Sequence, residues 1–187
     1  MTEMGPPPKA RRPEILRAGL LILGVWGIGV AALTFGGRGS FLHAMLSGLA
    51  FMASILGALV GVMMLIFAKS SAQQILGWQL AGTSAFVASL MAASVSLGQQ
   101  LSLRDVEEAK AYCERLRPAI AAHRSRTGDY PESLADLPSN PPVPRLLVGT
   151  DFYRRTPDGY EFSIILPQRI FAVLIYSSLQ DRWHESD

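Results

Sequence analysis

The sequence stretch 75-ILGWQLAGTSAFVASLMAASVSLG-98 is apolar and rich in small residues, and the charged stretch 104-RDVEEAKAYCERLRPAIAAHRSR-126 follows it closely. The first stretch has the length of a membrane-spanning helix, because about 20 helical residues cross the roughly 30 Å hydrocarbon core of a bilayer. The second stretch keeps apolar residues at helical spacing, which is typical of a helix packed on another layer. Together they predict a membrane helix that delivers the chain into an extramembrane domain.

Two further apolar blocks, residues 18–35 and 41–68, precede this stretch. Between residues 18 and 98 the only charged side chains are Arg38 and Lys69, and both fall between blocks. Each block reaches the length that a transmembrane helix needs, and the connections are short. The sequence therefore predicts three transmembrane helices packed as antiparallel neighbours.

The predicted organisation has three parts. Residues 1–17 form a flexible basic N-terminal tail that contains a proline run. Residues 18–98 form a three-helix transmembrane domain. Residues 99–187 form a small α+β extramembrane domain, called the head below, in which a helix packs on an antiparallel β-meander.

The helix of the head is predicted from apolar residues that recur at alternating spacings of three and four, and Gly128 is well placed to end it in a left-handed conformation. A capping-box pattern at Ser102–Asp105 permits a fresh helix start there, and an unbroken continuation of the membrane helix is equally compatible with the sequence. Pro118 is expected to kink this helix. The recurring residues are Val106, Ala109, Cys113, Leu116, Ile120 and His123.

Strand-like runs follow the helix. Residues 160–166 alternate, with Tyr160, Phe162, Ile164 and Leu166 predicted on one face. Shorter runs at 146–148 and 152–155 precede them, and residues 170–177 follow after a turn. Runs joined by such turns predict the antiparallel meander.

Basic residues near membrane ends favour the cytoplasmic side. One side has five such residues and the other has three, which places the N-terminus in the cytoplasm and, after three crossings, the head outside. The five are Lys9, Arg11, Arg12, Arg17 and Lys69, and the three are Arg38, Arg104 and Lys110.

Small residues spaced by four run along the third apolar block. Small side chains let helix backbones approach closely in a membrane, where no hydrophobic force joins helices. This stripe either packs the three helices on one another or docks a partner subunit. Its members, predicted as the docking residues, are Gly77, Ala81, Ala85, Ser89 and Ala93.

The head resembles the globular part of type IV pilins and type II secretion pseudopilins. The resemblance rests on a helix ending in Gly128-Asp129-Tyr130-Pro131, on Ser133-Leu134 and Leu137, and on Asp158-Gly159-Tyr160 before further strands. The family's N-terminal processing motif is not present. The resemblance implies a multi-pass protein of the bacterial cytoplasmic membrane with a periplasmic head, and a role in assembly without a catalytic residue.

Signals for chemistry are few. The sequence has no glycine-rich phosphate loop, nucleophile elbow or zinc-protease motif, and Cys113 is the single cysteine. Bases interleaved with acids disfavour nucleic acid. His43 is expected to be an interfacial histidine, with ligation of a haem or pigment as the alternative. We therefore predict no catalytic residue, no cofactor and no metal.

The predicted function is that of a non-catalytic accessory or assembly subunit of a larger bacterial membrane complex. Its expected partners are the lipid bilayer and integral membrane proteins of a secretion or pilus-like machine, or of a photosynthetic or respiratory assembly. The alternative is a membrane module that binds or senses a small molecule.

Overall fold

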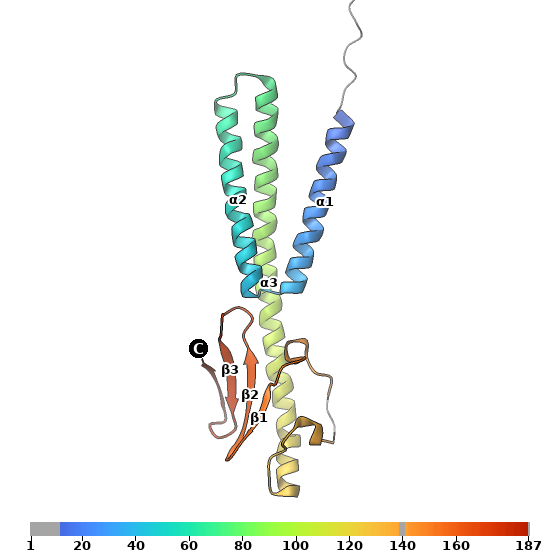
Figure 1. The fold of residues 1–187 in the computed structure, drawn as a ribbon, viewed down its shortest axis with the longest axis vertical. Helices are drawn as coiled ribbons and strands as arrows, with labels where there is room; N and C mark the ends of the chain where they lie inside the picture. Colours follow the sequence, from blue (N-terminus) through green and yellow to red (C-terminus); the bar gives the residue numbers. More distant parts are fainter. Residues whose placement is uncertain (1–11, 139–140, 187) are drawn as a thin grey trace, which may run out of the picture.

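The computed structural model describes residues 12–138 and 141–186, with residues 12–23 described in their backbone alone, and over these ranges three long helices precede a four-stranded sheet (Figure 1). The elements are α1 (Arg12–Gly37), α2 (Phe41–Ile66), α3 (Ser71–Thr127), the short 3-10 helices η1 (Leu134–Asp136) and η2 (Arg145–Leu147), and the strands β1 (Tyr153–Thr156), β2 (Gly159–Ile165), β3 (Val173–Ser177) and β4 (Arg182–Ser186).

Helix α3 runs without a break from the apolar half of the molecule into the head (Figure 1). Its 57 residues make it about 86 Å long at about 1.5 Å per residue. The capping-box pattern at Ser102 starts no new helix, because Ser102 is a buried residue inside α3. Pro118 also lies inside the helix, and Gly128 ends it with φ 86° in the left-handed region, as predicted.

Among the described residues, α2 and α3 are long and apolar enough to cross a membrane, whereas the described apolar part of α1, Gly24–Gly37, is shorter. The tail predicted over residues 1–17 lies outside the described residues up to position 11, and residues 12–17 belong to α1. Figure 1 shows α1 diverging from the α2–α3 pair towards its N-terminus.

Glycine brings α2 and α3 together. A Cβ atom added at Gly61 would lie 2.6 Å from the backbone nitrogen of Ala81, and one at Gly57 would lie 2.5 Å from the hydroxyl of Ser84. Both distances are shorter than a real Cβ tolerates. The missing side chain therefore lets the backbone of Gly61 touch that of Ala81 and makes room for the Ser84 side chain at Gly57. Hydroxyls in the same helices bond back along the chain, as in Ser54 Oγ to Ala50 O at 2.8 Å.

The sheet is an antiparallel meander in the order β1-β2-β3-β4. One predicted strand is not present, and one strand of the sheet was not predicted. The run at residues 146–148 is not a strand, because Pro144 precedes a 3-10 turn, η2, in which Leu147 N bonds to Pro144 O at 2.9 Å. Strand β4 was not predicted, because its sequence RWHES is largely polar and two of its residues are exposed at its free end.

An aromatic row crosses the whole sheet at one register. Tyr153 pairs with Phe162, Phe162 with Tyr176, and Tyr176 with Trp183. Neighbouring ring centroids along the row lie 5.4–6.0 Å apart, within the range of favourable aromatic contacts. Buried residues of the sheet and of α3 belong to one hydrophobic core, to which α3 contributes Ala109, Tyr112, Cys113, Leu116 and Ile120.

Candidate docking surface and its junction with the head

The predicted docking stripe of α3 does not lie on one face. Gly77 is buried against α2, where an added Cβ would lie 2.9 Å from the side chain of Leu65, and Ala81 lies against Gly61. Ala85, Ser89 and Ala93 are exposed. A step of four residues turns a helix by about 400°, so each step drifts by about 40° and the stripe leaves the contact with α2 after two residues.

Buried and half-buried residues of α3 follow alternating steps of three and four instead, and Gly77, Ala81 and Ser84 among them contact α2. This period, close to 3.5 residues, keeps a seam turned towards one partner helix. The sequence contains this spacing as well as the spacing by four, and Gly77 and Ala81 belong to both sets. The residues that follow the alternating steps are Gly77, Ala81, Ser84, Ala88, Met91, Val95, Gly98 and Ser102, all buried or half-buried.

Ala85, Ser89 and Ala93 form what we call the outer face of α3. The hydroxyl of Ser89 donates to the carbonyl of Ala85 at 2.9 Å, so its hydrogen is already used within the helix. The outer face therefore offers a low, smooth strip on which another helix can approach closely.

His43 joins the three helices through a chain of hydrogen bonds at one end of the bundle. The side chain is 1% exposed. Its Nε2 lies 2.9 Å from Ser94 Oγ on α3, and Ser94 Oγ lies 2.6 Å from Thr34 Oγ1 on α1. The backbone N–H of Gly39 donates to His43 Nδ1 at 3.1 Å.

The donors fix the direction of this chain. Because Nδ1 accepts from Gly39, the neutral ring carries its hydrogen on Nε2 and donates it to Ser94. The hydroxyl of Thr34 donates to Val30 O at 2.7 Å, so Ser94 is the donor in its bond with Thr34. Both ring nitrogens of His43 are thus occupied, which leaves neither free to ligate a haem or pigment in this arrangement.

Glycines enclose the same ring. A Cβ at Gly98 would lie 2.5 Å from His43 Cε1, and one at Gly37 would lie 2.9 Å from His43 Cβ. Gly39 has φ 73° and its missing side chain faces the carbonyl of Gly98 at 2.6 Å. The ring is held by van der Waals contact as well as by hydrogen bonds. The contacting glycines and His43 are far apart in the sequence, so local sequence patterns do not pair them.

The junction between the apolar bundle and the head is closed by bonds from both parts. Arg38, in the turn after α1, lies 2.7 Å from the carboxylate of Asp105 on α3. Arg145 of η2 donates to the carbonyl of Gly36 at 3.0 Å. The bond from Arg145 satisfies a carbonyl at the end of α1, where carbonyl groups lack partners within the helix.

A second set of bonds reaches the junction from the β2–β3 connection. The backbone N–H of Phe41, at the start of α2, donates to Pro167 O at 2.9 Å. Gln168 reaches the carbonyl of Gln99 on α3 at 3.5 Å. The head is therefore bonded to all three helices where they meet it.

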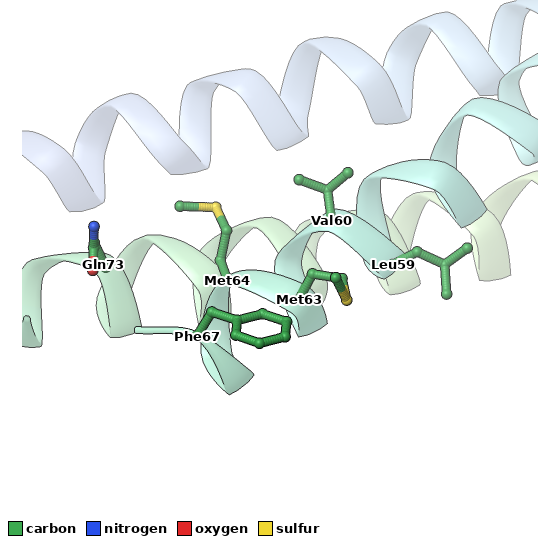
Figure 2. Close-up of a pocket in the computed structure, with 6 residues that line it drawn as sticks. All are labelled: Leu59, Val60, Met63, Met64, Phe67 and Gln73. Atoms are coloured by element: carbon green, nitrogen blue, oxygen red, sulfur yellow. The ribbon is translucent and has the colours of Figure 1, made fainter. Parts of the chain in front are cut away.

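Apolar hollows open on the sides of the bundle. One of about 500 Å³ lies between α1, α2 and α3 and is lined by Trp26, Leu33, Leu46 and Met91 among others. Another of about 520 Å³ lies near the α2–α3 turn, and Figure 2 shows its lining of Leu59, Val60, Met63, Met64, Phe67 and Gln73. Methionine adapts to irregular apolar surfaces, so these hollows suit lipid chains or a neighbouring helix.

The described part of the chain offers neither a cluster of metal-ligating side chains nor a reactive cysteine. The residues in it include no group of three or more His, Cys, Asp or Glu side chains that could hold a metal ion. Cys113 is fully buried in the core of the head, and burial raises the pKa of its thiol to about 12. A thiol of this kind is a packing residue, because the thiolate is the reactive form.

No known protein family, curated protein or solved structure matches the chain. The likeness of the head to pilins and pseudopilins accordingly stays a prediction from its sequence motif.

Proposed function

We propose that this chain is a non-catalytic accessory or assembly subunit of a larger bacterial membrane complex. In this proposal α1, α2 and α3 all cross the cytoplasmic membrane, the N-terminus is cytoplasmic, and the head is periplasmic and pseudopilin-like. The excess of basic residues on the N-terminal side supports this orientation. The integral membrane proteins of the complex, together with the bilayer, are the partners.

The observation that carries the proposal is the fixed attachment of the head to the bundle. Helix α3 passes from one to the other without interruption, and Arg38–Asp105, Arg145–Gly36 and Phe41–Pro167 bond the two parts together. A domain that only needs to be tethered to a membrane requires none of these bonds. Fixed orientation is useful where a head must meet a second protein at a set height and angle.

The docking surface in this proposal is the outer face of α3. Ala85, Ser89 and Ala93 are exposed, and other residues of α3, such as Gly77 and Ala81, make the contacts with α2. Small side chains on a lipid-facing helix allow close packing with a further helix. The apolar hollow beside Trp26 and Met91 offers a second place for a partner helix or a lipid chain.

The test is co-purification from native membranes in mild detergent, followed by mass spectrometry. Ala85→Leu and Ser89→Leu should release the partner proteins, because a larger side chain separates the helices. Ala44→Leu, at an exposed position on α2, is the matched control and should retain them. If both outer-face variants keep the same partners in the same amounts as the unmodified chain, this docking surface is wrong.

A second candidate is a module that binds or senses a small molecule. A polar cleft in the head, between Arg124 on α3 and Asp181 at the end of the sheet, favours it. A module of this kind is stable without partners, and its thermal midpoint rises with its ligand. A subunit instead loses abundance when its partner is deleted.

A further inference from the structure

A cleft of about 460 Å³ lies between the last turns of α3 and the end of the sheet that is far from the bundle. Arg117 and Arg124 of α3 line one side, and Tyr160, Ser178 and Asp181 line the other. Its volume falls within the range of about 300–1,000 Å³ that is usual for small-molecule sites. The cleft takes no part in the core of the bundle or in the junction.

Part of the cleft is a closed network of charges. Arg117 bonds to Glu114 at 2.6 Å and also to Asp181, and the hydroxyl of Tyr176 donates to Asp181 at 2.7 Å. These two partners, Tyr176 first and Arg117 second, hold the pKa of the Asp181 carboxyl below its usual value. The guanidinium of Arg117 also lies 4.9 Å from the centre of the Tyr176 ring. Of the two carboxylates that Arg117 pairs with, Asp181 lines the cleft and Glu114 does not.

Arg124 lies outside this network. One of its N–H groups donates to the hydroxyl of Tyr130 at 2.6 Å, and its guanidinium carbon lies 4.5 Å from the centre of the same ring. Among the residues that the structure describes, no carboxylate forms an ion pair with Arg124. A guanidinium has five N–H donors, so most of those on Arg124 are available at the cleft.

A further donor lies across the cleft. The hydroxyl oxygen of Ser178 accepts from the backbone N–H of Tyr160 at 2.8 Å, which leaves the Ser178 hydrogen free to donate to a ligand. The charged residues that line the cleft are Arg117, Arg124 and Asp181, which sum to one positive charge, and Asp181 is already paired with Arg117. An apolar ligand would leave these groups without partners, and a cation would meet the unpaired Arg124.

We propose that this cleft binds an oxyanion, the carboxylate or phosphate group of a water-soluble ligand, with Arg124 as the principal contact. The planar guanidinium matches both groups, since it can donate two parallel hydrogen bonds to either. Tyr130 holds the Arg124 side chain in place from beneath. The site does not depend on the membrane docking proposed above, because none of its residues belongs to the outer face of α3 or to the junction.

The experiment uses the full-length chain in detergent and three probes: inorganic phosphate, an acetylated Gly-Ala dipeptide with a free C-terminal carboxylate, and the same dipeptide amidated. Binding is measured by titration calorimetry. Phosphate or the free carboxylate should bind, and the amide should bind at least about tenfold more weakly, because it lacks the charge. Binding of phosphate alone assigns the site to phosphate ligands, and binding of the acid alone assigns it to carboxylates.

Arg124→Gln should weaken binding by about tenfold or more, and Arg126→Gln is the matched control. Arg126 is exposed near the same helix end but does not line the cleft, so its replacement should leave affinity unchanged. Slow alkylation of buried Cys113 in each variant shows that the head is still folded. The proposal is overturned if none of the probes binds, if acid and amide both bind with the same affinity, or if folded Arg124→Gln retains full affinity for the probe that binds the unmodified chain.

Discussion

The guanidinium of Arg38 lies 2.7 Å from the carboxylate of Asp105, across 67 positions of sequence. Their side chains are 33% and 13% exposed. Arg38 itself has φ 39°, in the left-handed region that residues other than glycine rarely adopt. The ion pair thus holds a strained turn between α1 and α2 against α3, at the level where α3 enters the head.

Asp105→Asn should lower the free energy of unfolding by about 1 kcal/mol, because a partly buried pair loses less to solvent screening than an exposed one. The coupling is measured by a double-mutant cycle with Arg38→Gln during unfolding of the detergent-solubilised chain. Arg154–Glu161 on the sheet, with Arg154 77% exposed, is the comparison pair, and its coupling should be smaller. Equal coupling energies for the two pairs would contradict this view of the junction.

Gly98→Ala should destabilise the bundle by about 1–3 kcal/mol, because the added methyl meets His43 Cε1 at 2.5 Å and the packed ring has little room to move. Gly82→Ala, on the same helix, has nothing within 4 Å of the added Cβ and is the control. It should be neutral or slightly stabilising, since alanine favours helix over glycine. Thermal unfolding in detergent separates the two variants, and similar midpoints would show that Gly98 is not a tight contact.

Ser94→Ala tests the chain of hydrogen bonds through the bundle. It removes the hydroxyl that joins His43 to Thr34, and we expect a loss of about 1 kcal/mol, in the range of side-chain hydrogen bonds between membrane helices. Ser96→Ala is the control, because Ser96 is exposed and bonds only to Ala92 within its own helix. Equal unfolding free energies for the two variants would show that the hydrogen bonds from His43 through Ser94 to Thr34 do not stabilise the bundle.

Cys113 should resist alkylation by iodoacetamide in the folded chain and react readily in denaturant, since its thiol is fully buried and the chain has no other cysteine. Mass spectrometry of the labelled protein gives the rate directly. Prompt labelling at neutral pH without denaturant would show that this core opens often.

The stability of the head should fall at alkaline pH. Burial raises the pKa of Cys113 from 9.0 to about 12 and that of Tyr153 from 10.0 to about 12. The unfolded state therefore releases these protons at lower pH than the folded state, and stability declines as pH rises from about 9 towards 12. Replacing Cys113 with Ala should flatten the lower part of this decline, from about pH 9, and an unchanged slope would exclude the thiol as a cause.

Features of the fold that depend on neighbouring residues were predictable from the sequence. The unbroken apolar periodicity through Ala109, Leu116 and Ile120 predicted the buried side of α3 in the head, and Gly128 predicted its end. The alternation at Tyr160, Phe162 and Ile164 predicted the inner face of β2. These signals are local, because helices and strands repeat their side-chain directions over a few residues.

What the sequence analysis missed depends on positions far apart. His43, Ser94 and Thr34 meet only when the three helices are packed. The residues next to each of them in the sequence do not indicate the other two. The docking stripe was read along a step of four residues, and helical drift divides it between the seam and the outer face. Arg124 lies opposite Asp181 and Ser178 only in the folded chain, because α3 and the end of the sheet are far apart in the sequence.

The absence of a break in the described length of α3 makes this helix a lever. From the junction near Gln99 to Thr127 it extends about 42 Å at about 1.5 Å per residue. A tilt of its apolar half by about 10° would carry Thr127 sideways by about 7 Å if the helix stays straight. Crowding or release of the bundle by its surroundings would then move the cleft beside Arg124, which lies near the far end of α3.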